Sequence, residues 1–193
     1  MLPLAITGRA CAASLFRTMK LPALLLLLGI LAVSAASAAT PAAPDATVND
    51  FFKYLLSAKH DIMKDSAAQN RWLTKAVRQI VTTTDAAATK AAKAHPNEEI
   101  DGVDNGTFLA AWDPPTSFKI TKVESKDGAT TARVDLLYTW GPKTEYPGET
   151  RKMTVLLTME DGAWKVSDIQ SHKSKFNSES TLLSDLRGLA RQH

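Results

Sequence analysis

The segment from residue 117 to residue 171 constrains the fold more than any other part of the chain, because its apolar residues recur at every second position. Within 129–140 and again within 151–159, apolar side chains alternate with mostly polar ones, which is typical of a half-buried strand. Asp-Gly dipeptides at 127–128 and 161–162 favour tight hairpin turns between neighbouring runs. The segment therefore predicts a four-stranded antiparallel meander with one apolar face that the rest of the chain must cover.

Residues at helical spacing can supply that cover. A first helix is predicted from Thr47 to His60, and a second helical stretch from about Ala67. Because Thr82–Thr84 is a run of β-branched residues with low helix propensity, we expect either two helices or one strongly bent helix across it. A last helix is expected to begin at Asn177 or Ser178. The predicted fold class is α+β, with N-terminal helices packed on a curved four-stranded antiparallel sheet and a C-terminal helix.

The amino end has the layout of a secretory signal peptide. An apolar run from Leu21 to Val33 follows Met19-Lys20 and precedes small residues, so we predict that residues 1–38 are removed and that translation starts at Met19. The run is too short for a retained membrane span, which needs about 20 apolar residues. Residues 39–46 are then an Ala/Pro linker, and 47–192 form a single domain. The expected location is periplasmic or secreted.

Charge and cysteine content narrow the function classes. The chain has 23 Lys and Arg against 20 Asp and Glu, but residues 1–39 hold three of the basic residues and no acid, so the remainder is neutral. A neutral domain lacks the basic surface of a nucleic-acid-binding protein. The only cysteine, Cys11, falls in the predicted signal peptide, which excludes disulfides and thiol chemistry from the exported part. We expect no nucleic-acid partner.

Metal and cofactor motifs are also missing from the sequence. No two histidines have zinc-site spacing, and the acidic stretch from Glu98 to Asn105 lacks the ligand pattern of an EF-hand. No glycine-rich phosphate loop appears after residue 40. The residues from Asn97 to Pro115 show no periodicity and predict a solvated loop, attached to the body by Phe108, Leu109 and Trp112. We predict no cofactor and no metal.

Several short motifs then suggest a family. The first helix contains Val-x-x-Phe-Phe-x-x-Leu-Leu (Val48 to Leu56), the second begins with Trp72-Leu73-Thr74, and the last predicted strand spans Ala163 to Ile169 after an Asp-Gly turn. With a Leu-rich final helix, this order resembles the nuclear transport factor 2-like superfamily, and within it the small secreted bacterial domains of unknown function. The resemblance implies a cone of helices wrapped by a bent sheet, with a pocket opening between them.

Asp168 is the strongest catalytic candidate. If Trp164 and Val166 face the core, strict alternation also directs Asp168 inward, where a carboxylate in apolar surroundings could serve as a general base. In the alternative, a β-bulge turns Ile169 into the core and moves Asp168 to the rim, where it pairs with or caps another group. His172 or His60 could complete an acid-base pair with Asp168 or Asp61. Both histidines are more typical of exposed element ends.

The leading functional interpretation is an exported, non-catalytic binding domain of the bacterial cell envelope, whose partner is a protein or a small molecule. Two alternatives are an immunity protein against a secreted antibacterial toxin and a small-molecule isomerase, dehydratase or hydrolase with a pocket carboxylate. A filled apolar interior would favour binding at the surface, whereas an open one would favour an enzyme. The candidate binding residues are Trp112, Tyr138, Trp140, Trp164 and Asp168.

A homodimer is a further prediction from the sheet. Leu137 and Leu156 occupy the nominally polar face of their strands, and apolar residues at such positions favour contact with a second copy through the outer sheet face.

Overall fold

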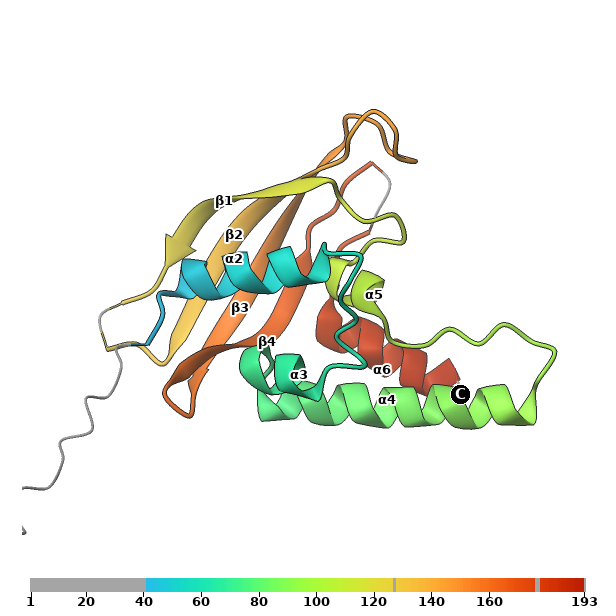
Figure 1. The fold of residues 1–193 in the computed structure, drawn as a ribbon. Helices are drawn as coiled ribbons and strands as arrows, with labels where there is room; N and C mark the ends of the chain where they lie inside the picture. The colour runs from blue at the N-terminus through green and yellow to red at the C-terminus, as the bar shows by residue number, and fades with distance from the viewer. Residues whose placement is uncertain (1–40, 127, 176–177, 193) are drawn as a thin grey trace, which may run out of the picture. The chain divides into compact units, whose positions relative to one another are not determined.

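A five-stranded antiparallel sheet forms the centre of the computed structural model, which describes residues 41–126, 128–175 and 178–192 (Figure 1). Every strand pairs with its neighbour in the sequence, giving the order β1-β2-β3-β4-β5. The predicted meander over 117–171 is therefore confirmed. The strands are β1 (Ser117–Glu124), β2 (Thr131–Thr139), β3 (Thr150–Glu160), β4 (Ala163–Ser171) and β5 (Ser180–Thr181).

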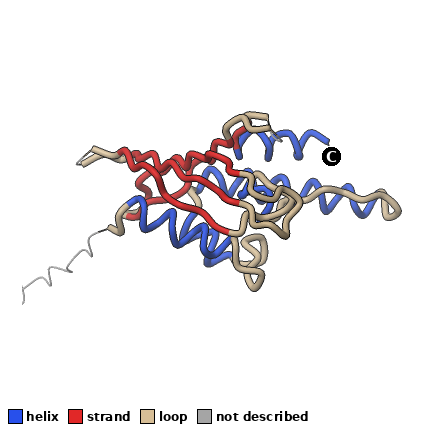
Figure 2. The backbone as a smooth tube through the Cα atoms, turned by 90° about the horizontal axis from the view of Figure 1, so that it is seen from above, coloured by secondary structure: helices blue, strands red, loops and turns tan. Residues whose placement is uncertain are grey.

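The alternation also predicts correctly which side chains face the core. Val134 and Leu136 of β2 and Val155 of β3 are fully buried, and Trp164 of β4 is 8% exposed. The strands form one curved layer in Figure 2, and α2 (Pro44–Leu55) runs along one side of it. We call the face that packs on α2 the inner face and the opposite one the outer face.

The first helix begins earlier and ends earlier than predicted. Pro44 lies at its first position, which suits proline because proline lacks the N–H that a helix start leaves unpaired. Asp45 lies in the first turn. The helix therefore starts inside the predicted linker, with Ala43 as N-cap in place of Thr47. The prediction of helix as far as His60 is wrong, because α2 ends at Leu55 and turns follow. The predicted signal peptide, the start at Met19 and Cys11 lie outside the described residues.

Two helices follow, but the break lies elsewhere than predicted. Helix α3 (Ser66–Trp72) ends where Thr74 caps α4 (Lys75–Ala94), accepting the backbone N–H of Val77 at 3.3 Å. The backbone N–H of Thr74 donates to Val166 of β4. The predicted break at Thr82–Thr84 is wrong: Thr82 and Thr83 donate their hydroxyls to carbonyls one turn earlier, and Thr84 donates to Leu186.

Two short elements were not expected. The segment predicted to be a loop contains α5 (Asn105–Leu109), which Asp104 and Thr107 cap reciprocally. Phe108 and Leu109 are buried as predicted, but Trp112 is 86% exposed and does not attach the segment to the body. After the sheet, β5 pairs with β4, and the last helix begins at Leu182 rather than near Ser178.

Helix α6 (Leu182–Gln192) completes the fold. It packs against α4, and the two run side by side in Figure 1. Leu182 and Leu186 are its buried residues, and the Leu186 carbonyl accepts the Thr84 hydroxyl. No helix in the described part of the chain is both long and apolar enough to span a membrane.

Candidate functional site

The space between α2 and the sheet is filled. Phe51 and Phe52 are fully buried, and the Phe52 ring centroid lies 5.7 Å from that of Phe118 and 5.8 Å from that of Tyr138. Such edge-to-face and tilted aromatic contacts are typical of a packed core. The apolar interior favours recognition at the surface.

Asp168 lies beside a β-bulge. It pairs with Leu156, and the register of β3 and β4 shifts between Leu156 and Leu157. Ile169 is 2% exposed and faces the core, as in the bulged alternative. Asp168 Oδ1 accepts the backbone N–H groups of Ile169 at 2.9 Å and of Leu183, in the first turn of α6, at 3.1 Å. The carboxylate therefore acts as a cap that ties the end of the sheet to the last helix.

The electrostatics of Asp168 are consistent with that role. Burial raises the pKa of Asp168 above its usual range, while the two backbone hydrogen bonds and the charge of Arg187 act in the opposite direction. A raised pKa is also found in catalytic acids, but the hydrogen bonds to this carboxylate come from two backbone N–H groups. The Asp168 carboxylate therefore has a structural role, and it has no acid-base partner among the described residues.

Replacing Asp168 with alanine should lower the free energy of unfolding by about 0.5–2 kcal/mol, the usual cost of a lost helix cap. The substitution Asp168→Asn keeps an oxygen acceptor, so that variant should retain most of this stability. Because the folded-state pKa is raised, the native carboxyl favours folding below its unfolded value of 3.8 and loses that contribution as the pH rises through the folded-state pKa. Urea unfolding between pH 3 and 7 should show a flatter profile for Asp168→Asn, and identical profiles would contradict this.

His172 has a different partner from the predicted one. Its Nε2 lies 2.8 Å from Thr154 Oγ1, and Thr154 Oγ1 donates to Asp135 Oδ1 at 2.7 Å. Since the hydroxyl proton points to the carboxylate, His172 Nε2 is the donor in its own contact. Four residues of extended strand separate His172 from Asp168, or roughly 13 Å. The structure does not bring them together as an acid-base pair.

The Thr154 network is structural. Asp135 is 7% exposed and Thr154 fully buried, and Arg133 and Lys152 contact the same carboxylate at 3.2 and 3.3 Å. Burial alone would raise the pKa of Asp135, but hydrogen bonds from Thr154, Lys152 and Arg133 and the Lys152 charge outweigh it, so the pKa is lowered.

The outer face carries the two leucines from which a homodimer is predicted. Leu137 and Leu156 are only half-buried there. The homodimer through this face stays a prediction.

His60 lies in a separate shallow cavity. Its ring stacks on Tyr54 with centroids 4.5 Å apart, and the Tyr54 hydroxyl donates to Asp65 at 3.0 Å. Burial, together with the Asp65 hydrogen bond and charge, raises the pKa of Tyr54 to about 12. This cavity of about 430 Å³ contains neither Asp168 nor His172.

The predicted binding aromatics divide into two groups. Tyr138 and Trp140 are 0% and 1% exposed, and Trp164 is nearly as well buried, so all three are core residues. Trp140 is also fixed by its Nε1, which donates to the Asp113 carbonyl at 2.9 Å. Trp112 is the one member of the predicted set whose ring is available to a partner.

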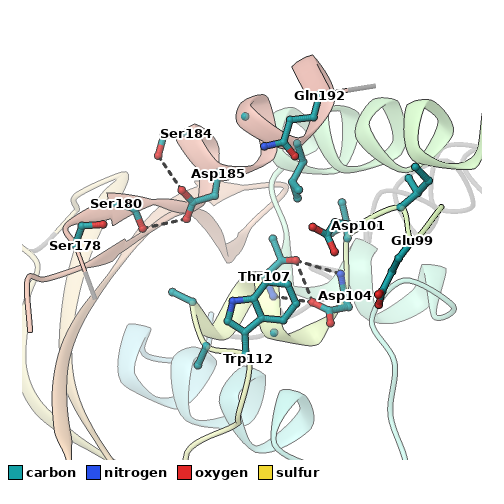
Figure 3. Close-up of a pocket in the computed structure, with 18 residues that line it drawn as sticks. Glu99, Asp101, Asp104, Thr107, Trp112, Ser178, Ser180, Ser184, Asp185 and Gln192 are labelled. Atoms are coloured by element: carbon teal, nitrogen blue, oxygen red, sulfur yellow. Dashed lines mark hydrogen bonds between the residues drawn. The ribbon is translucent and has the colours of Figure 1, made fainter. Parts of the chain in front are cut away.

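Trp112 lies at a cavity of about 630 Å³ between residues 99–112 and α6 (Figure 3). We call this cavity the acidic groove. Its walls combine apolar, hydroxyl and carboxylate side chains, and the described residues that line it include no Lys, Arg or His. Its carboxylates belong to Glu99, Asp101, Asp104 and Asp185.

One wall of the acidic groove is the tightly wound α5 segment. Asn105 joins it to the turn after α2, because its side chain donates to the carbonyls of Leu55 and His60 and accepts the N–H of Ile62. A Cβ on Gly106 would lie 2.8 Å from the Ala111 carbonyl oxygen, so the wall requires glycine there. These contacts place Trp112 next to a fixed piece of backbone.

The other wall is one face of α6, from Asp185 to Gln192. Asp185 accepts hydrogen bonds from Ser180 at 3.0 Å and Ser184 at 3.3 Å, as Figure 3 shows. Sequence reasoning did not find the groove, because its walls are far apart in the chain and neither carries a recognisable motif. The available signal was a tryptophan in an acidic, aperiodic segment, where packing was the expected role of the ring.

Comparisons of the chain with protein-family models, curated protein sequences and solved structures find no match. The α+β class stands on the strands and helices themselves. Among the described residues, no group of three or more His, Cys, Asp or Glu side chains could hold a metal ion.

Proposed function

We propose that this protein is an exported, non-catalytic binding domain of the bacterial cell envelope and that it recognises its partner in the acidic groove. One observation carries the proposal: Trp112 is 86% exposed beside a cavity of about 630 Å³. Exposed aromatic rings at a concave surface are typical anchors of protein interfaces. The secretory layout of residues 1–38 and the resemblance to secreted nuclear transport factor 2-like domains support export and a binding role.

The enzymatic alternative has less support. Its pocket would lie between α2 and the sheet, where Phe51, Phe52 and Tyr138 fill the space. Its proposed base, Asp168, caps α6. An immunity protein that binds a secreted toxin would be one form of the proposed binding domain.

Site-specific photo-crosslinking tests this proposal. A photoreactive phenylalanine analogue at position 112 should give discrete adducts in the cells that produce the protein. Val123, on the edge strand β1, is the matched control, because it is the other large hydrophobic residue that is exposed in the described chain, at 41%. Adducts at position 112 alone would support the groove, whereas equal adducts at both positions, or none at 112, would contradict it.

A further inference from the structure

We infer that the acidic groove takes an extended basic peptide segment, with a lysine or arginine side chain of the partner over the Trp112 ring. The inference rests on the proposed function and names the chemistry of the partner. It combines a cavity, an exposed aromatic ring and a charge distribution.

The groove concentrates negative charge in a domain whose acidic and basic residues are equal in number overall. Residues 40–193 carry equal numbers of acidic and basic residues. In the described chain, the groove is lined by acidic residues and by no basic ones. Glu99, Asp104 and Asp185 form no ion pair with a described residue. The hydrogen bonds to Asp104 and Asp185 come from hydroxyl and backbone N–H groups, which leave the negative charge in place.

Helix geometry keeps the basic residues of α6 away from the groove. Asp185, Gly188, Leu189 and Gln192 line it, and they follow the spacing of three and four residues that defines one helix face. Arg187 and Arg191 lie two and six positions after Asp185, which at roughly 100° per residue places them about 160° and about 120° away from it around the helix. Neither arginine lines the groove.

The distribution of the carboxylates favours a chain of positive charges over a single ion. The described residues contain no acidic cluster that could hold a metal ion, so the groove carboxylates do not converge on one point. They come from the segment before α5 and from α6, on the two walls of the cavity (Figure 3). Spread carboxylates complement successive lysine or arginine side chains of an extended segment.

Trp112 supplies the aromatic contact. A cation over an indole face gains about 0.5–1 kcal/mol at an exposed site and about 2 kcal/mol when water is excluded. The backbone that precedes Trp112 is fixed at α5, where the N–H of Ala111 donates to the Gly106 carbonyl at 3.1 Å. A cavity of about 630 Å³ lies within the range of about 300–1,000 Å³ found for ligand sites, which suits a short stretch of peptide.

Binding of blocked hexalysine to the purified protein, measured by fluorescence anisotropy of a labelled peptide, tests the inference. Hexalysine should bind, hexaglutamate should not, and the affinity should fall between 50 and 300 mM salt, because screening weakens exposed charge pairs. Trp112→Ala should weaken binding by about 3- to 30-fold. Glu99→Gln should weaken it by about 1.4- to 5-fold.

Two control variants shorten an apolar side chain and remove a carboxylate outside the groove. Val123→Ala shortens the other exposed apolar side chain, and Asp85→Asn removes an exposed carboxylate from α4; both should bind hexalysine like the unaltered protein. Circular dichroism of every variant verifies that it is folded. Loss of affinity in the groove variants alone would support the inference.

Three outcomes would overturn it. The first is no binding of hexalysine, and the second is equal binding by the groove and control variants. The third is binding of spermine as tight as that of hexalysine, which would assign the groove to a small polyamine. If position 112 still crosslinks to a partner while hexalysine fails, the proposed function stands and only the basic-peptide inference falls. If both experiments fail, both proposals fall.

Discussion

Replacing Phe52 with alanine should lower the free energy of unfolding by about 3–5 kcal/mol, one of the largest effects expected from any single substitution in this chain. Phe52 is fully buried between α2 and the sheet, with ring centroids of Phe51, Phe118 and Tyr138 between 5.3 and 5.8 Å away. These rings belong to three different elements, so their collapse into the space of the lost ring would require the elements to move. Urea unfolding followed by tryptophan fluorescence measures the change.

Phe52→Leu is the matched control, because it keeps an apolar side chain and leaves a smaller void. It should cost clearly less than Phe52→Ala. The comparison also tests the filled interior on which the non-catalytic proposal depends. If Phe52 instead lined an open pocket, its truncation would enlarge a space already accessible to solvent, and a cost below about 1 kcal/mol would contradict the packed core.

The sheet could be predicted from sequence because the strand period is exact. Each strand residue alternates between two faces, so Val134, Leu136 and Val155 had to share one of them. The side on which Asp168 lies could not be predicted. A single bulged residue reverses the alternation, and nothing in the local composition distinguishes the two registers before the partner strand is known.

The predictions of the helix boundaries were wrong for a different reason. Intrinsic propensity disfavours the Thr82–Thr84 run, but α4 gains a buried contact of Thr84 with α6 that overrides it. The observed break comes from Thr74, whose backbone N–H pairs with Val166 of a strand far along the chain. Local sequence cannot contain that partner. The short elements α5 and β5 span too few residues to establish a period.

The candidate site shows the same limit. Trp112 was among the predicted binding residues, but so were Tyr138, Trp140 and Trp164, and no feature of the sequence separates exposed from buried rings. Only the structure separates them: the other three rings lie in the core, whereas the Trp112 ring is exposed. The acidic groove itself depends on α6 lying beside α5, a contact that only the fold provides.

The ends of β2 and β3 hold a second polar feature, buried in the core. Arg151 is 4% exposed; its guanidinium lies 4.8 Å from the Trp140 ring centroid and donates to the Ala110 carbonyl at 2.8 Å. Its Nη2 is 3.5 Å from Glu149 Oε1, a long contact for an ion pair. Arg151 Nε, Glu149 Oε2 and the Tyr138 hydroxyl have no hydrogen-bond partner among the described residues. Several buried polar atoms of this cluster therefore lack hydrogen bonds.

Replacing Arg151 with alanine should cost about 3–5 kcal/mol, because the buried Glu149 carboxylate would lose its cation and Trp140 its covering side chain. The double variant Arg151→Met/Glu149→Gln should regain most of that loss. It removes both charges, keeps apolar volume over Trp140, and retains an amide oxygen to accept the Ser174 hydroxyl. We expect its unfolding free energy to fall within about 1 kcal/mol of that of the unaltered protein. A double variant as unstable as Arg151→Ala would show instead that the ion pair itself stabilises the ends of these strands.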